Sequence, residues 1–261
     1  MRFGLQKLTL LDYPGVMACT VFTNGCNFRC PFCHNASIVT GKESDMPLDT
    51  DGLLTFLDSR KKILDGVCIT GGEPLLHDEI PGIISEIKKL GYKVKLDTNG
   101  SRPERLHKIL DAGNVDYVAM DIKHSPEKYA LASGCDSALE PVKKSVELLK
   151  NASVEFEFRT TVVAQLHTPD DMEAIARWIA GVKHYYLQNF ADSGDILQRD
   201  TQFSPVPKDT LNEMLKRVTP FVRSHHYEHR KRSVRPLCDS GRFVPSDALS
   251  QSEHIRSSLH H

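Results

Sequence analysis

The repeated alternation of short β-rich runs with longer amphipathic runs, between residues 16 and 189, most constrains how this chain can fold. The alternation predicts strands at residues 16–23, 66–70, 93–97, 117–122, 153–163 and 184–188. It predicts helices between them at residues 49–64, 78–90, 103–112, 139–151 and 168–180, where apolar residues recur every three or four positions. Strands that alternate with helices predict an α/β fold, in which a parallel sheet has its helices outside.

Signals at the helix ends support these assignments and divide the chain into two regions. Thr168 is a typical helix start, and Gly91 is a typical helix end. One more helix is expected over residues 207–223. We expect residues 1–224 to form the folded domain and residues 225–261 to form a polar, basic, disordered tail, because that tail has little apolar surface to bury. A docking arm for nucleic acid or for a partner protein is the alternative for the tail.

Three cysteines lie close together just after the first predicted strand: Cys26, Cys30 and Cys33. This spacing can hold three corners of a cubane iron–sulfur cluster, in which cysteine ligation of all four irons is the usual set. The sequence offers no fourth cysteine nearby, so one iron would stay open. An open metal position is typical of a catalytic site, because a substrate or cofactor can bind there.

A zinc site and chance clustering are the alternatives that the cysteine spacing leaves open. Structural zinc needs four ligands, usually as two separated pairs. His34 directly follows Cys33, and adjacent residues rarely both reach one small ion, so His34 is a poor fourth ligand. Disulfides are disfavoured, because the chain has seven cysteines, an odd number, and its first residues do not resemble a secretory signal.

The second predicted strand, residues 66–70, runs directly into Gly71, Gly72, Glu73 and Pro74. Glycines at a strand end let the backbone approach a ligand closely, and a side chain would block that approach. Alone, such a turn is a weak signal. Together with the cysteine triplet about forty residues earlier, it becomes a strong signal of a ligand-binding turn.

The cysteine triplet with Phe32 before its third member, followed by this glycine turn, resembles the radical S-adenosylmethionine (radical SAM) superfamily over about residues 5–200. The resemblance implies that the three cysteines bind a 4Fe–4S cluster, whose open iron takes the amino and carboxylate groups of S-adenosylmethionine. It implies that the turn from Gly71 to Glu73 holds the ammonium group of that cofactor. The implied fold is a partial (β/α)6 barrel, and functional residues in such folds lie at the carboxyl ends of strands.

Two further strand ends carry acidic residues: Asp97 with Thr98 and Asn99, and Asp121 with Lys123. Two carboxylates at neighbouring strand ends need a cation between them, unless one of them takes a proton. Both segments are similar to those of the pyruvate formate-lyase activating enzymes within the superfamily. That similarity implies a monovalent cation held by Asp97, Thr98 and Asp121, and two solvated loop aspartates are the alternative.

Further contacts with S-adenosylmethionine are expected on the same strand ends. Lys123 suits the methionyl carboxylate as a point charge. Arg159 lies inside an apolar strand and needs an anionic partner, either this carboxylate or Glu157. Asn99 is the expected partner of the ribose hydroxyls, and Phe32 either lies against the adenine or packs in the core.

The activating enzymes carry a histidine after the sixth strand, and this chain departs from them there. Gln188 and Asn189 are the substitutes that the sequence offers. We expect the other histidines of the α/β region to be solvated: His77, His107, His124 and His167. Cys19 and Cys68 are expected in the core, and Cys135 is the one spare thiol expected to be exposed near the cleft.

Residues 10–15 and 33–35 resemble the activating proteins of anaerobic ribonucleoside-triphosphate reductases. The resemblance implies an enzyme that cleaves S-adenosylmethionine reductively to a 5′-deoxyadenosyl radical and installs a glycyl radical on a partner enzyme. An external one-electron donor such as flavodoxin or ferredoxin would supply the electron. The runner-up is a radical SAM enzyme that modifies a small molecule, nucleobase or peptide. A non-catalytic iron–sulfur electron carrier or sensor is the alternative of another class, although it would not need the glycine turn.

Composition adds constraints on location and partners. A formal net charge of −1 gives no global attraction for nucleic acid or anionic membranes. The sequence contains no apolar run close to the ~20 residues that a membrane-spanning helix needs. Free cysteines and an oxygen-sensitive cluster favour a reducing compartment. We therefore expect a cytoplasmic protein that does not depend on membranes or nucleic acid.

Overall fold

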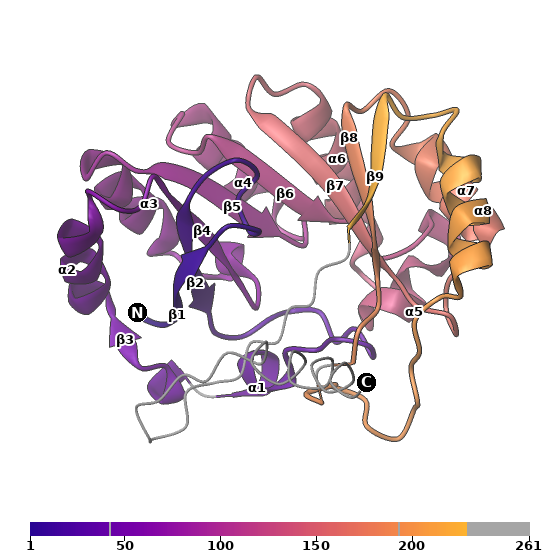
Figure 1. Ribbon diagram of the computed structural model, residues 1–261, viewed down its shortest axis with the longest axis horizontal. Coiled ribbons are helices and arrows are strands. Elements are labelled where there is room, and N and C mark those ends of the chain that lie inside the picture. The colour runs from indigo at the N-terminus through magenta and orange to yellow at the C-terminus, as the bar shows by residue number, and fades with distance from the viewer. Residues whose placement is uncertain (42, 193, 229–261) are drawn as a thin grey trace, which may run out of the picture.

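A curved, open sheet forms the centre of the computed structural model, which describes residues 1–41, 43–192 and 194–228 (Figure 1). Its strands lie in the order β3-β1-β2-β4-β5-β6-β7-β8-β9. Neighbours from β2 to β9 are parallel, whereas β1 pairs antiparallel with β2 and β3. The strands are β1 (Arg2–Thr9), β2 (Ala18–Thr23), β3 (Leu48–Asp49), β4 (Gly66–Gly71), β5 (Lys93–Thr98), β6 (Tyr117–Asp121), β7 (Glu155–Val162), β8 (His184–Asn189) and β9 (Ser224–Glu228).

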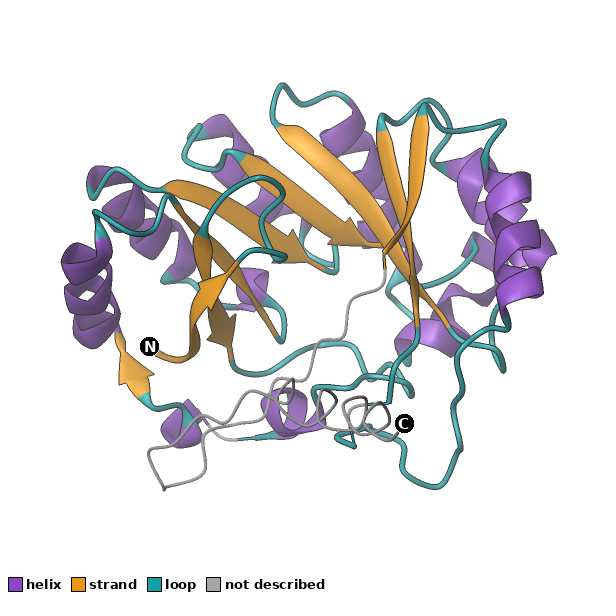
Figure 2. Ribbon diagram, viewed as in Figure 1, coloured by secondary structure: helices purple, strands orange, loops and turns teal. Residues whose placement is uncertain are grey.

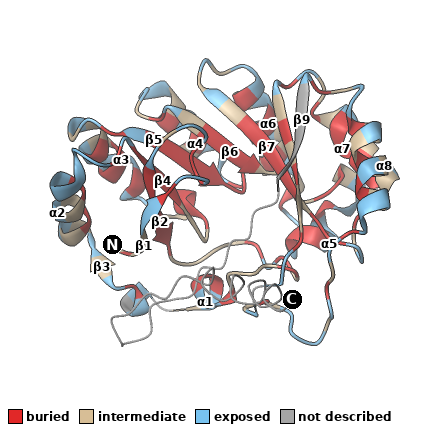
Figure 3. Ribbon diagram, viewed as in Figure 1, coloured by how far each residue is buried: buried red, intermediate tan, exposed pale blue. Residues whose placement is uncertain are grey.

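Helices connect these strands and cover the outer face of the sheet (Figure 2). The α-helices are α1 (Ala36–Thr40), α2 (Thr50–Arg60), α3 (Ile80–Lys89), α4 (Pro103–Asp111), α5 (Tyr129–Ser133), α6 (Leu139–Lys150), α7 (Pro169–Trp178) and α8 (Lys208–Val218). Short 3-10 helices are η1 (Glu43–Asp45), η2 (Pro74–Leu76) and η3 (Pro126–Lys128). Figure 3 shows buried strands at the centre and exposed residues on the outward sides of the helices.

The predicted α/β architecture is confirmed. The predicted strands correspond to β2, β4, β5, β6, β7 and β8, and their neighbours are parallel. The connecting helices α2, α3, α4, α6 and α7 lie where the amphipathic runs predicted them. The linear strand order leaves β3 and β9 at opposite ends of the described sheet, so the barrel is partial.

Local sequence signals account for the helices that pack against the sheet. Helix α3 buries Ile80, Ile83, Ile84 and Ile87, which recur at helical spacing along one face. Helix α7 begins with a capping box, in which Thr168 Oγ1 accepts from Asp171 N and Asp171 Oδ2 accepts from Thr168 N. The predicted helix over residues 207–223 is present as the shorter α8.

Three strands extend the fold beyond the sequence-based prediction, and one of them is the two-residue β3 at the edge of the sheet. Strand β1 was not predicted, and it covers the edge of β2 as an antiparallel neighbour. Strand β9 continues the folded region to Glu228, four residues past the boundary predicted at residue 224, because its backbone pairs with the edge of β8. Residues 229–261, the rest of the predicted tail, lie outside the described residues.

The parallel arrangement places the carboxyl ends of six neighbouring strands, β2 and β4 to β8, at one edge of the sheet. In Figure 1 the loop after β2 and helix α1 pass beneath this edge. Side chains at these strand ends can therefore face one another across the opening of the sheet. Among the described helices, none is long and apolar enough to cross a bilayer.

Candidate active site

One cavity at the carboxyl ends of the strands brings the predicted site residues together. Its lining includes the predicted residues Cys26, Cys30, Phe32, Cys33, Gly71, Gly72, Asp97, Thr98, Asn99, Asp121, Lys123 and Arg159. These residues come from the loop after β2 and from β4, β5, β6 and β7. The cavity therefore has cysteine sulfur on one wall and charged side chains on the other.

Residues 24–35 after β2, here named the cysteine segment, are held by hydrogen bonds to several other parts of the chain. Gly25 N donates to Ile38 O at 3.0 Å, and Arg29 N donates to Ser133 O at 2.8 Å. From the loop after β8, Leu197 N donates to Cys33 O at 2.9 Å and Gln198 N donates to Pro31 O at 3.1 Å. Because Ser133, Leu197 and Gln198 are distant from the cysteines in sequence, the fold itself positions the cysteine segment.

The three predicted cluster ligands line the same cavity. Within the described residues, no group of three His, Cys, Asp or Glu side chains is arranged to hold a single metal ion. Burial raises the pKa of all three thiols, that of Cys30 to about 12, so metal binding must displace their protons.

The glycine turn lies against the cysteine segment. A Cβ on Gly72 would stand 1.8 Å from Gly25 O, and a Cβ on Gly71 would stand 2.5 Å from Thr23 N. Gly71 also has a φ of +113°, which favours glycine. The sequence predicts close approach of a ligand at both glycines. The structure adds a different reason, since backbone of the cysteine segment occupies the space of a side chain at Gly72, and backbone of β2 occupies it at Gly71.

Glu73 lies behind the cavity wall and is absent from its lining. Its Oε1 accepts from Thr98 Oγ1 at 2.8 Å and from Leu75 N at 3.0 Å, and its Oε2 accepts from Asn99 N at 2.6 Å. The residue is fully buried, and burial raises the pKa of its carboxyl to about 7, against the lowering effect of these hydrogen bonds. The Glu73 carboxyl thus joins the end of β4 to the end of β5.

Arg159 bridges the two strand-end carboxylates that the sequence analysis placed around a cation. Its Nη1 lies 3.2 Å from Asp97 Oδ2, and its Nε lies 2.9 Å from Asp121 Oδ1. Asp97 also pairs with the buried Lys95, and Glu157 Oε1 lies 3.8 Å from Arg159 Nη1. The positive charge between the two aspartates is therefore supplied by side chains of the protein.

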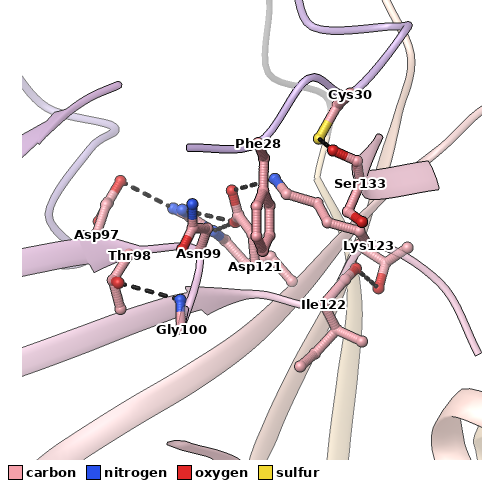
Figure 4. A network of polar contacts seen from close by, with 12 residues as sticks. Phe28, Cys30, Asp97, Thr98, Asn99, Gly100, Asp121, Ile122, Lys123 and Ser133 are labelled. Carbon is pink, nitrogen blue, oxygen red and sulfur yellow. Dashed lines mark hydrogen bonds and ion pairs between the residues drawn. The ribbon is translucent and has the colours of Figure 1, made fainter. Parts of the chain in front are cut away.

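Lys123 extends this network toward the cysteines. Figure 4 shows its ammonium beside Asp121, where Nζ lies 3.1 Å from Oδ2. Burial alone would raise the pKa of Asp121, but Arg159 and Lys123 outweigh it and lower that pKa to about 2. Burial would lower the pKa of Lys123, but Asp121 raises it above its usual value. Both groups are consequently charged at neutral pH.

His124 and His167 are buried, and the prediction that they are solvated was wrong. Their rings stack at 4.6 Å, with 0% and 3% exposed. His167 Nδ1 accepts from Val163 N at 3.1 Å, so its Nε2 carries the proton that is donated to Lys123 O at 3.0 Å. The loops after β6 and β7 fold over each other at this point, and His167 thereby fixes the backbone of Lys123.

Glu73 and His167 are expected to change stability in opposite directions over one pH range. The pKa of Glu73 is raised from 4.5 to about 7, so its contribution to folding is full at low pH and is lost as the pH rises through 7. Burial and the neighbouring His124 lower the pKa of His167 from 6.5 to about 4, so its contribution is present above 6.5 and is lost as the pH falls to 4.

We therefore expect the free energy of unfolding to fall with rising pH in His167→Gln and to rise with pH in Glu73→Gln. Between pH 4 and pH 7.5, the free energy of unfolding should change by roughly 2–3 kcal/mol in each variant. The unmodified protein should have a pH slope between those of the two variants. Urea unfolding of the cofactor-free proteins from pH 4 to pH 7.5 measures this. The test is the slope of unfolding free energy against pH, because both variants also lose hydrogen bonds and so differ from the unmodified protein at every pH. Three parallel curves would contradict the pKa shifts assigned to Glu73 and His167.

The remaining expectations have mixed outcomes. Phe32 lines the cavity and also packs edge-on against His167 and Phe203, at 6.3 and 6.4 Å between centroids. Gln188 and Asn189 both line the cavity, and the amide of Asn189 also pairs with the backbone of Val206. Cys19 and Cys68 are buried, as predicted, and Cys135 is not a lining residue of the cavity.

Sequence reasoning missed several lining residues: Phe28, Asn35, Val39, Thr70, Thr161 and Ala191. One of them carried a usable signal, because Thr161 follows Arg159 by two positions on β7 and must share its face of the sheet. Lys95 does not line the cavity but pairs with Asp97, and it could have been found in the same way, two positions before Asp97 on β5.

Comparisons with known proteins agree with this geometry. The model of the Radical SAM superfamily matches residues 20–179. A Methanocaldococcus jannaschii protein named as a glycyl-radical enzyme activating enzyme is 31% identical over 225 residues, which are 84% of this chain and 92% of the relative. The pyruvate formate-lyase-activating enzyme of Clostridium pasteurianum is 28% identical over 188 residues, 69% of this chain and 76% of that protein.

Other similar proteins carry names that differ from those of the activating enzymes. A Thermococcus kodakarensis protein named as a GTP 3′,8-cyclase is 28% identical over 186 residues, 63% of this chain and 60% of that protein. The structure of Streptococcus suis SuiB bound to S-adenosylmethionine superposes with a TM-score of 0.64 at 12% identity, over 80% of this chain and 49% of SuiB. At that identity the likeness concerns the fold, and this chain spans about half of SuiB.

Proposed function

The chain belongs to the radical SAM superfamily, and we propose that it installs a glycyl radical on a partner enzyme. The observation that carries this proposal is the M. jannaschii relative named as an activating enzyme, which matches this chain over 92% of its own length. The similarity to the pyruvate formate-lyase-activating enzyme adds to it. The partner would be a protein substrate of the anaerobic ribonucleotide reductase type.

The residues of the cavity fit the cofactors that this family uses. Cys26, Cys30 and Cys33 would each bind one iron of a 4Fe–4S cluster and leave one iron open. When bound, the reduced cluster supplies the electron that cleaves S-adenosylmethionine to methionine and a 5′-deoxyadenosyl radical. The task of the protein is to bind and orient the cofactor and to exclude water from the cavity.

The opposite wall would hold S-adenosylmethionine. Lys123 is cationic and faces the same cavity as the three thiols, so we assign it to the methionyl carboxylate. Backbone groups of Gly71 and Gly72 would take the ammonium group, and Phe32 would border the adenine. Glu73 would act indirectly, by holding Thr98 and the Asn99 backbone in place.

The resemblance to the activating enzymes implies a monovalent cation at Asp97, Thr98 and Asp121. The carboxylates already carry Arg159 and Lys95, so we propose that these side chains replace such a cation. An external one-electron donor of the flavodoxin or ferredoxin type would reduce the cluster. Free thiols and such a cluster suit the reducing cytoplasm, where we propose that the protein acts.

A second candidate is a radical SAM enzyme that modifies a small molecule, nucleobase or peptide. The similarity to a protein named as a GTP 3′,8-cyclase is the observation that favours it. That similarity covers less of this chain than the similarity to the activating enzyme does, which is why we rank it second.

The test is anaerobic reconstitution with iron and sulfide, followed by dithionite and S-adenosylmethionine, with and without a candidate anaerobic ribonucleotide reductase. We expect 5′-deoxyadenosine and a glycyl-radical signal in the electron paramagnetic resonance (EPR) spectrum of the partner. Deoxyadenosine without a partner radical would favour the second candidate. A loaded cluster that never cleaves S-adenosylmethionine would favour an electron carrier or sensor.

Cys30→Ala is the matching loss-of-function variant. We expect it to bind less iron and to form deoxyadenosine more than about 100-fold more slowly, because one of three ligands is gone. Cys135→Ser is the control, since Cys135 is a partly exposed thiol outside the cavity lining. Equal turnover by Cys30→Ala and Cys135→Ser would show that the cysteine segment is not part of the active site.

A further inference from the structure

The side chain of Asn99 connects the end of β5 to the cysteine segment. Its Nδ2 lies 3.1 Å from Asn27 Oδ1 and 3.7 Å from Cys26 Sγ. Asn99 is 6% exposed, so this amide lies in the protein interior. The sequence analysis assigned Asn99 to the ribose of the cofactor, whereas its amide nitrogen here contacts a predicted cluster ligand.

Neighbouring hydrogen bonds fix which end of the amide faces the sulfur. Ser101 N donates to Asn99 Oδ1 at 2.9 Å, so that atom is the oxygen. Ser101 Oγ donates to Asn27 Oδ1 at 3.2 Å, so Asn27 also presents its oxygen to this junction. The two N–H groups of Asn99 are therefore divided, one toward Asn27 and one toward Cys26.

The sulfur atoms of Cys26 and Cys30 have different surroundings. Cys26 Sγ also accepts from Phe28 N at 3.4 Å, which gives it a second N–H donor. Cys30 Sγ instead lies 3.7 Å from Ser133 O, an acceptor, as Figure 4 shows. Donors directed at Cys26 are suited to a sulfur that carries negative charge, as a metal-bound thiolate does.

From this geometry we infer that Asn99 raises the reduction potential of a cluster bound by the cysteine segment, through its N–H bond to Cys26 Sγ. The inference rests on the proposed function in one respect, because it requires a 4Fe–4S cluster at these cysteines. Reduction adds one electron, and an N–H donor at a ligand sulfur stabilises the added negative charge. Asn99 is thus a positioning residue, which makes reduction by an external donor easier.

The test is a potentiometric titration of the reconstituted cluster, followed by EPR, without S-adenosylmethionine or a partner. We expect a lower midpoint potential in Asn99→Leu, which has a similar size and no N–H donor. Asn99→Ala also removes the donor, adds no charge and avoids the bulk of leucine, so it should lower the potential even if the leucine variant folds poorly. Asn27→Ala is the matched control, because it removes the hydrogen bond between Asn99 and Asn27, here called the tether, and leaves the Asn99 amide beside Cys26.

A second readout observes the hydrogen bond itself. In D2O, electron–nuclear double resonance of the reduced cluster should detect exchangeable deuterons from both donors to Cys26 Sγ, Asn99 Nδ2 and Phe28 N. The Asn99 coupling should persist in Asn27→Ala and disappear in Asn99→Leu, whereas the Phe28 coupling should remain in both variants. Equal potentials in the unmodified protein and both Asn99 variants would overturn the inference. A shift in Asn27→Ala as large as that in Asn99→Leu would also overturn it, because the tether would then be the cause.

Failure of this inference is distinguishable from failure of the proposed function. Unchanged potentials in variants that still cleave S-adenosylmethionine would contradict the role of Asn99 alone. A purified protein that assembles no cluster at all would contradict both.

Discussion

Replacing Gly72 with alanine should separate the glycine turn from the cysteine segment and abolish cluster assembly. The new Cβ would stand 1.8 Å from Gly25 O and 2.6 Å from Gly25 C, and backbone atoms cannot rotate away as a side chain can. Gly72 N also donates to Thr23 O, and Glu73 N donates to Gly25 O, both at 2.9 Å. Relief of the clash therefore requires that these hydrogen bonds lengthen or break.

We expect this variant to lose about 2–4 kcal/mol of unfolding free energy without cofactors, the range for a forced backbone shift. Urea unfolding measures the loss, and the iron content after reconstitution measures its effect on the site. Gly82→Ala is the control, because a Cβ there meets no atom within 4 Å and lies on α3. It should gain about 0.5–1 kcal/mol from helix propensity. A Gly72 variant as stable as this control would refute the close contact.

Replacing Arg159 with methionine should destabilise the fold by about 3–5 kcal/mol, the cost of breaking a buried ion pair by removing one partner. Asp97, Asp121 and Glu157 would lose their shared cation, and Asp97 and Glu157 are both nearly fully buried. Arg159→Lys should lose less, although one ammonium cannot bridge two carboxylates as a guanidinium does. Urea unfolding at pH 7.5 measures both variants.

Arg217→Met is the matched control for burial. Arg217 also contacts three carboxylates, those of Asp170, Glu173 and Glu213, but its side chain is 41% exposed. Solvent screens these pairs, so the loss of stability should be much smaller than that of Arg159→Met. If Arg159→Met and Arg217→Met lose equal free energy of unfolding, burial does not strengthen the ion pairs of Arg159. Arg159→Met should also lose activity, since Asp121 would no longer be held between Arg159 and Lys123.

Much of this architecture follows from local patterns in the chain. The spacing of Ile80, Ile83, Ile84 and Ile87 predicts helix α3 and its buried face, and both are observed. The rule that functional residues lie at the carboxyl ends of parallel strands predicts one shared cavity, and Asp97, Asp121 and Arg159 meet there. These successes depend on periods of two and 3.6 residues, which a sequence displays directly.

The direction in which a strand-end side chain points depends on contacts that a sequence does not display. Glu73 lies behind the cavity because Gly71 has a positive φ and because two groups at the end of β5, Thr98 Oγ1 and Asn99 N, donate hydrogen bonds to its carboxylate. His124 and His167 are buried because the loops after β6 and β7 cover each other. Strand β9 forms from a polar segment because β8 offers it a free edge, so backbone pairing outweighs composition.

The register of the outer strands has a practical consequence for labelling the protein. Phe3 pairs with Thr23 at the carboxyl end of β2, and Glu228 pairs with Gln188, which lines the cavity. The start of β1 and the end of β9 therefore lie along the same rim as the cavity, and a fluorophore attached near Phe3 would stand on that rim. The turn at Gly113, between α4 and β6, is at the opposite edge, and a Cβ there meets no atom within 4 Å. A reporter inserted at Gly113 should leave the rim accessible.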